Sequence, residues 1–194
     1  MRSAGCGGRV LLEVVVVLIA MFSWGDRLDG APGTGTLYGT SLNPDRDAWE
    51  VFRVDLTTGA GTRITDRHSL FSVAVHPGTG ALYAGGGGAF PVIRTGIFQV
   101  DPASGALDFV GASGLVGDSG LGLVSILGMD FDAEGTLYAV VNMIGSDLVQ
   151  AGSDHLVTID IHTGAATVIG PFGECDGGTC TIEGIDGIAF DADG

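Results

Sequence analysis

Gly35-Thr36-Leu37-Tyr38 sets the pattern of this chain, because the same phrase returns as Gly80-Ala81-Leu82-Tyr83 and Gly135-Thr136-Leu137-Tyr138. A second phrase, in which Val-Asp or Ile-Asp precedes a Thr-Gly or Ser-Gly pair, lies between the copies at 54–60, 100–106 and 159–165. The first glycines of the Leu-Tyr phrases, together with Gly194, are 45, 55 and 59 residues apart. Repeats of this length are typical of propellers and other repeat arrays.

Each repeat predicts four short strands. The first strand alternates apolar with small or polar residues, at 72–77, 128–132 and 187–191. The second begins at the Leu-Tyr phrase, the third ends at the Val-Asp phrase (50–54, 96–100 and 156–159), and the fourth follows the turn (62–65, 107–111 and 166–170). Four antiparallel strands per repeat make a propeller blade. We therefore expect an all-β fold, a β-propeller with about three blades in residues 32–194.

Composition and charge exclude some classes of partner. The chain has 35 glycines and no lysine, which disfavours long helices and suits short strands joined by tight turns. Its net charge of −15 comes entirely from residues 95–194, which contain fifteen acidic residues and no Arg or Lys. Such a surface repels phosphate backbones, so nucleic acid is not an expected partner. The acids serve solubility, and the alternatives are binding of divalent cations or adaptation to high salt.

The N-terminal segment predicts export. Arg2 and Arg9 precede an apolar run from Val10 to Phe22, and small and turn-forming residues follow it. This is the organisation of a secretory signal peptide, and the run is too short to cross a membrane. Glu13 interrupts the run and leaves a type IV prepilin-like signal or an uncleaved anchor as alternatives. We expect residues 1–31 to be a signal peptide or anchor, no other membrane segment, and an extracytoplasmic location.

Export decides how the cysteines are interpreted. Cys6 falls within the signal, which leaves Cys175 and Cys180 with four residues between them. In an oxidising compartment a close, even pair is most simply a disulfide that closes a loop. A redox pair would favour Cys-x-x-Cys at the start of a helix, and zinc would need further ligands nearby. We predict a structural disulfide between Cys175 and Cys180.

The chain resembles exported β-propellers of the NHL, YncE-like and SMP-30-like families. Gly187-Ile188-Ala189-Phe190-Asp191-Ala192-Asp193-Gly194 and Gly135-Thr136-Leu137-Tyr138-Ala139 carry the resemblance. In those families this phrase is the innermost strand of a blade, the turn, and the start of the second strand. The resemblance covers residues 35–194 and is specific for architecture rather than activity. Since propellers typically have four to eight blades, we expect the chain to be the front part of a longer protein.

Asp130 and Asp186 are the candidate metal ligands. Asp130 takes the place in its repeat that Ala74 and Ala189 hold in theirs. The resemblance to SMP-30-like propellers implies that such an acid could face a central channel that holds a catalytic metal. Ca2+ is the candidate metal. The competing interpretation is a solvated channel acid without a ligand. Asp132-Ala133-Glu134-Gly135, although similar to the start of a calcium loop, is predicted to be a hairpin turn.

These observations predict a non-enzymatic binding or scaffold module at the cell surface or in the periplasm. No catalytic residues and no cofactor are identified, and the partner is an unknown protein or small molecule. The alternative is a metal-dependent, lactonase-like hydrolase built on channel carboxylates, with Asp130 among them. The sequence names no substrate for either function.

Overall fold

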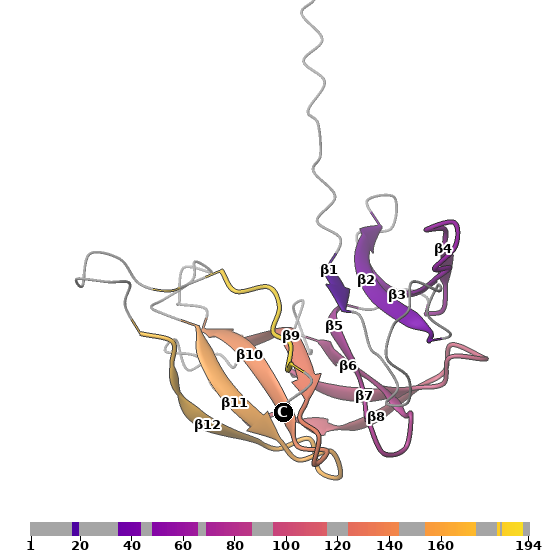
Figure 1. Cartoon of the computed structure of the whole chain (residues 1–194). Coiled ribbons are helices and arrows are strands. Elements are labelled where there is room, and N and C mark those ends of the chain that lie inside the picture. Colours follow the sequence, from indigo (N-terminus) through magenta and orange to yellow (C-terminus); the bar gives the residue numbers. More distant parts are fainter. Residues whose placement is uncertain are drawn as a thin grey trace, which may run out of the picture.

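The computed structural model describes residues 17–19, 35–43, 48–65, 69–86, 95–115, 124–143, 154–173, 182 and 184–191. These residues form three four-stranded antiparallel sheets, each built from strands that follow one another in the chain (Figure 1). No helix long and apolar enough to cross a membrane lies in these ranges. The expectation of an all-β fold of four-stranded antiparallel sheets is therefore confirmed.

Strand order in each sheet follows the sequence. The first sheet contains β1 (Val17–Ile19), β2 (Leu37–Asn43), β3 (Ala48–Val54) and β4 (Gly61–Arg63). The second contains β5 (Leu70–Val75), β6 (Leu82–Gly86), β7 (Gly96–Val100) and β8 (Leu107–Ala112). The third contains β9 (Val124–Phe131), β10 (Leu137–Met143), β11 (His155–Ile159) and β12 (Ala166–Pro171).

The Val-Asp phrase forms the turn between the third and fourth strands of each sheet. The Oδ1 of Asp55 accepts the N–H groups of Thr57 and Thr58 at 2.8 Å, and Gly59 closes the turn at a φ of 72°. Asp101 and Asp160 accept from the residue two positions later in the same way. The repeated sequence is therefore explained by a repeated turn, in which Asp bonds the backbone and Gly adopts positive φ.

The turn predicted for Asp132-Ala133-Glu134-Gly135 is also confirmed. The Oδ1 of Asp132 accepts the N–H of Thr136 at 2.7 Å, and Gly135 has a φ of 88°. The Asp132 carboxylate thus closes the hairpin between β9 and β10.

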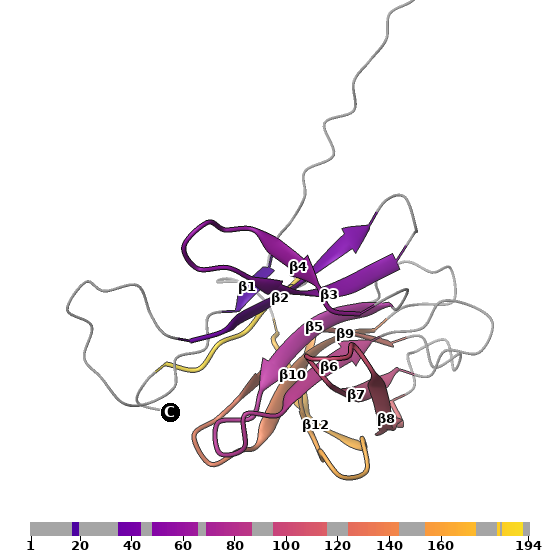
Figure 2. The same ribbon diagram turned by 90° about the vertical axis from the view of Figure 1, so that its right-hand side faces the viewer.

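Two apolar clusters join the three sheets. One lies between the first and second sheets and includes Val51, Leu70 and Val73. The other lies between the second and third sheets and includes Ile97, Met129 and Phe131. Figure 2 shows the first sheet lying over the second, with β9 beside β5. Burial of these apolar side chains supplies the main force that holds one sheet on the next.

Polar contacts fix the same junctions. The Oγ1 of Thr40 in β2 donates to the carbonyl of Phe71 in β5 at 2.9 Å. The Oγ of Ser72 in β5 donates to the carbonyl of Ile126 in β9 at 3.2 Å. A side chain of the first sheet and one of the second therefore each bond the main chain of the first strand of the next sheet, which sets how the sheets dock.

Among the strands that the structure describes, β1 alone lies outside the expected repeats. It comes from within residues 1–31 and pairs with β2, so that Val17 lies opposite Thr40 and Ile19 opposite Tyr38. Residues 187–191, expected to form a first strand, are described without strand pairing.

Candidate functional site

The carboxylate of Asp130 connects the third sheet to the segment 184–191. Asp130 lies in β9 opposite Tyr138 of β10. Its Oδ1 accepts the N–H of the adjacent Phe131 at 2.9 Å, and its Oδ2 accepts the N–H of Phe190 at 2.7 Å. Asp130 and Phe190 are 60 residues apart in the chain. Both carboxylate oxygens therefore bond main-chain N–H groups, one of them from the next repeat.

Ring packing reinforces this contact and repeats an earlier one. The rings of Tyr138 and Phe190 are 5.1 Å apart at 64°. Tyr83 and Phe131, which hold the same places one repeat earlier, are 5.6 Å apart at 60°. Gly128 of β9 approaches Gly187 so closely that a Cβ at position 128 would lie 2.8 Å from the Gly187 Cα. Residues 187–190 therefore lie on the third sheet as β9 lies on the second.

The surroundings of Asp130 change its acidity. Burial raises the pKa of the Asp130 carboxyl above its ordinary value, and the N–H groups of Phe190 and Phe131 oppose that rise in part. The two N–H donors offset part of the hydration that the charged form loses, and the carboxylate thereby ties the segment 184–191 to β9. A half-buried acid with a raised pKa is also the kind of group found at functional sites.

The described donors around Asp130 are too few to hold a metal ion by themselves. Asp186, the second predicted ligand, is exposed. No group of three His, Cys, Asp or Glu side chains that could hold a metal occurs in the part of the chain that the structure describes. One carboxylate already bonded to two N–H groups falls well short of the six to eight oxygens that Ca2+ takes. Metal binding by Asp130 and Asp186 stays a prediction.

The predicted disulfide lies beyond what the structure describes. Cys175 and Cys180 both fall in the range 174–181, which is outside the described residues. Their pairing therefore stays a prediction. The nearest described contact is the hydrogen bond from the N–H of Ile182 to the carbonyl of Gly173 at 2.9 Å, which brings the two sides of this range together.

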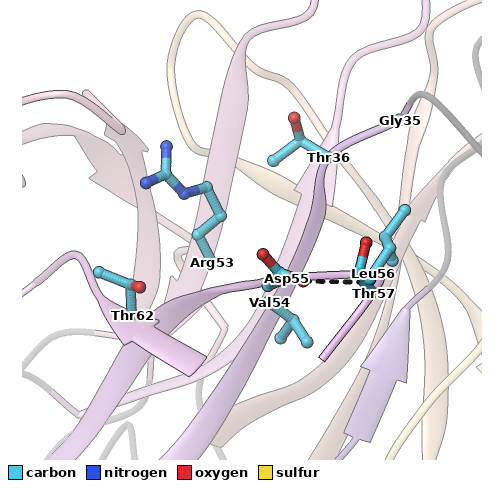
Figure 3. A pocket seen from close by; sticks show the side chains of 8 residues that line it. All are labelled: Gly35, Thr36, Arg53, Val54, Asp55, Leu56, Thr57 and Thr62. Carbon is cyan, nitrogen blue, oxygen red and sulfur yellow. Dashed lines mark hydrogen bonds between the residues drawn. The ribbon is translucent and has the colours of Figure 1, made fainter. Parts of the chain in front are cut away.

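A second candidate site is a pocket of about 310 Å³ on the first sheet. Its lining comes from the two residues before β2, the end of β3, the turn that follows and β4, and consists of Gly35, Thr36, Arg53, Val54, Asp55, Leu56, Thr57 and Thr62 (Figure 3). The lining is mainly polar, with one guanidinium and three threonine hydroxyls. The pocket can therefore offer several hydrogen-bond donors to a ligand.

The two charged side chains of this pocket, Arg53 and Asp55, differ in their surroundings. Asp55 is held by the turn, and the N–H groups of Thr58 and Thr57 lower the pKa of its carboxyl. Arg53 lies opposite Thr62 of β4 and Tyr38 of β2, and its side chain is exposed. The other described arginine, Arg63, lies 3.6 Å from the buried carboxylate of Glu50. Arg53 is therefore the described guanidinium that faces a pocket.

The sequence analysis did not predict this pocket, although the repeats contain a signal for it. Gln99 and Thr158 hold the position of Arg53 in the second and third repeats. A charged side chain thus replaces a neutral one in a single repeat, which is the same kind of exception that singled out Asp130. An exposed arginine is ordinary on a protein surface, so this exception alone does not predict a pocket.

Comparison with known proteins found similarity in structure alone. No protein-family model and no curated protein sequence match the chain. The extracellular domain of the one-component system BT4673 from B. thetaiotaomicron has 16% identity and a TM-score of 0.44 over 81% of this chain. A puromycin hydrolase mutant complexed with PGG has 20% identity and a TM-score of 0.41 over 70% of this chain. The chain spans 18% and 19% of their respective lengths, and no function is transferred from either.

Proposed function

We propose that the chain is part of an exported β-propeller that acts as a binding module rather than as an enzyme. The observation that carries this proposal is that its aspartate carboxylates accept hydrogen bonds from main-chain N–H groups. Asp55, Asp101, Asp132 and Asp160 close turns, and Asp130 holds the next repeat through the N–H of Phe190. Carboxylates occupied by main-chain donors maintain architecture and are poorly placed to bind a metal or move a proton.

The repeated docking of the sheets supports the propeller. At both junctions the first strand of the later sheet, β5 or β9, packs on the sheet before it, a side chain bonds its main chain, and an apolar cluster is buried. Residues 187–190 extend the same pattern beyond the third sheet. A rotation repeated from sheet to sheet is what builds a propeller around a central axis.

The N-terminal segment supports export. A charged start, a short apolar run and small residues make residues 1–31 a secretory signal or anchor. We place the rest of the chain at the cell surface or in the periplasm. Cell fractionation combined with mass spectrometry of the N-terminus tests this, and an intact chain recovered from the cytoplasm alone would refute it.

The pocket of Figure 3 suggests the class of ligand. Arg53 can bond both oxygens of a carboxylate, and the hydroxyls of Thr36, Thr57 and Thr62 can bond hydroxyl groups beside it. We therefore propose a small acidic ligand that also carries hydroxyls, of the uronic acid type. Asp55 on the same wall would repel a second negative charge, so one carboxylate is preferred to two.

Calorimetry with galacturonate and with neutral galactose tests this ligand class. We expect the acid to bind the wild-type protein and the Arg53→Gln variant to lose most of that binding. Glutamine suits the strand because Gln99 holds the equivalent position. Equal heats for the acid and the neutral sugar, or equal binding by the wild type and the variant, would remove the pocket as an acid-binding site.

Hydrolysis of lactones is the second candidate function, favoured by one observation. The raised pKa of the half-buried Asp130 is of the kind found at catalytic sites. Lactone hydrolysis measured with and without Ca2+ on the wild type and on Asp130→Asn tests it. Turnover that needs both Ca2+ and Asp130 would establish the enzyme and overturn the binding module.

A further inference from the structure

We propose that the leader, residues 1–31, completes the first sheet in the unprocessed chain and that it cannot enter a membrane while it does so. The apolar run from Val10 to Phe22 is the part of the leader that would direct export, and β1 (Val17–Ile19) lies inside this run. The inference rests on the proposed export of the chain. It connects export to folding, because the same residues serve either one or the other.

β1 occupies the place in the first sheet that β5 and β9 occupy in the second and third. It is the edge strand beside β2 (Figure 1), and like β5 and β9 it runs antiparallel to the strand that begins at a Leu-Tyr phrase. The residue opposite the tyrosine of that phrase is Ile19 in β1, Ala74 in β5 and Asp130 in β9. The leader therefore supplies the first strand in the register that the later repeats use.

The sequence explains why the leader suits this place better than the residues nearer to β2. In the second sheet a short turn separates the first two strands, since β5 ends at Val75 and β6 begins at Leu82. The same spacing in the first repeat selects Arg27-Leu28-Asp29-Gly30, which has one apolar side chain where Ser72-Val73-Ala74-Val75 has three. Val17-Leu18-Ile19 is apolar throughout and has two β-branched residues, the type that strands favour.

The hydrogen bonds of the first sheet show which main-chain groups of β2 point to β1. Successive residues of a strand direct their N–H and C=O groups to opposite neighbours. The N–H of Asp55, just after β3, donates to the carbonyl of Ala60, just before β4, at 2.9 Å. Val54, one residue earlier, therefore points to β2, and its partner Leu37 points to β3.

The same alternation assigns the main-chain groups on both sides of the contact. The N–H groups of Tyr38 and Thr40 point to β1, whereas that of Gly39 points to β3. Ile19 lies opposite Tyr38, so its N–H points back to β2, and the N–H of Leu18 points away from the sheet. The N–H groups of Tyr38, Thr40 and Ile19 are therefore the ones that depend on the pairing of the leader.

Pairing with β2 and insertion into a bilayer exclude each other. In hydrocarbon a segment has to satisfy its N–H and C=O groups internally, as a helix does. The main-chain groups of Ile19 are instead directed to β2, so β1 has to leave the sheet before the apolar run can insert. A chain whose first sheet has formed therefore cannot present its export signal to a membrane, and export has to begin before this sheet folds.

Two proline substitutions test the pairing in the full chain, made by cell-free synthesis so that the leader stays uncleaved. Ile19→Pro removes an N–H that points to β2, whereas Leu18→Pro, the matched control, removes one that points away from the sheet. Hydrogen exchange at the amides of Tyr38 and Thr40 should be at least about 10-fold faster in Ile19→Pro than in the wild type or the control. The amide of Gly39 should be equally slow in all three. Equal exchange at Tyr38 and Thr40 in the wild type and Ile19→Pro would overturn the proposal.

Flotation with vesicles of phosphatidylethanolamine and phosphatidylglycerol tests the consequence for membranes. The folded wild type and folded Leu18→Pro should stay largely unbound, whereas folded Ile19→Pro should bind at least about 10-fold more. All three chains should bind when they are diluted from urea directly onto the vesicles. Both prolines interrupt a helix, so a difference between the two folded variants reports the pairing with β2 rather than helix formation. Circular dichroism checks that both variants keep their β structure.

The flotation experiment separates failure of this inference from failure of the proposed export. Absence of binding by every chain, even after dilution from urea, would refute the leader as a membrane-directed signal and with it the proposed export. Binding from urea, together with equal binding by the folded wild type and folded Ile19→Pro, would refute only the role of β1 in withholding the leader. Binding by folded Ile19→Pro alone among the folded chains would support both.

Discussion

Gly111→Ala is the substitution that most sharply tests how the sheets dock. The Cβ of alanine at position 111 would lie 2.7 Å from the Thr163 carbonyl carbon and would overlap its oxygen, whereas ordinary contacts begin at 3.4 Å. These atoms belong to the main chain of the turn between β11 and β12, so no side-chain rotation can relieve the overlap. The turn must retreat from β8 by at least about 0.7 Å, the difference between those two distances.

Retreat of this turn weakens the whole junction. The hydrogen bond from the N–H of Ala166 to the carbonyl of Ser113, 2.9 Å long, spans the same gap. Overpacking costs about 1–3 kcal/mol, and a weakened hydrogen bond adds about 1 kcal/mol. We therefore expect Gly111→Ala to lower the free energy of unfolding by about 2–4 kcal/mol.

Urea unfolding followed by circular dichroism measures this change. Gly61→Ala is the control, because a Cβ there would meet Phe52 at an ordinary 3.6 Å and alanine already stands at the equivalent Ala166. We expect that control to be neutral or to stabilise by up to about 1 kcal/mol. Equal stability of Gly111→Ala and the wild type would show that the second and third sheets do not dock through this turn.

The remaining predictions concern acidity and the core. Because the folded-state pKa of Asp130 is raised, folding favours its protonated form. The free energy of unfolding of the wild type relative to Asp130→Asn should therefore fall as the pH rises above 3.8. Urea unfolding measures this difference, and a constant value between pH 3 and 7 would contradict the prediction. Hydrogen bonds, led by that from Ser104, lower the pKa of the exposed Asp101. Asp101→Asn should therefore lower the melting temperature at pH 7, and this effect should diminish below pH 3.8. An equal effect at pH 7 and below pH 3.8 would show that the charge is not involved. Phe131→Ala should cost about 3–5 kcal/mol in urea unfolding, since Phe131 is buried against the rings of Tyr83 and His76; a cost below about 1 kcal/mol would mean that this cluster does not join the sheets.

Much of the strand order was predictable because the repeats align. The third strand predicted at 96–100 is β7, and the fourth predicted at 107–111 is β8, which ends one residue later. The first strands were predicted too short. β5 begins at Leu70 and β9 at Val124, whereas the predictions began at Ser72 and Gly128.

A bulge explains both of these errors. The pairing of β5 with β6 shifts between Leu70 and Ser72, and the pairing of β9 with β10 shifts between Val140 and Val141, opposite Gly128 and Ile126. A bulge inserts one residue and breaks the two-residue alternation by which strands are recognised. Each prediction therefore began where regular alternation resumes.

The candidate site was predictable in part. Comparison of repeats singled out Asp130 because an acid stands there in place of alanine. Its partner was not predictable, because the N–H of Phe190 is a main-chain group and nothing in the sequence marks it. The pocket around Arg53 depends on how the residues before β2, the end of β3, a turn and β4 converge, which becomes visible only in three dimensions.

Hydrogen exchange at the amide of Phe190 tests most directly whether Asp130 holds the main chain rather than a metal. The account predicts slow exchange in the wild type, faster exchange in Asp130→Ala, and no change in either protein when Ca2+ is added. The amide of Val157, in the centre of the third sheet and fully buried, should remain protected in both and serves as the reference. Rapid exchange of Phe190 in the wild type, together with Ca2+ binding that Asp130→Ala abolishes, would contradict it.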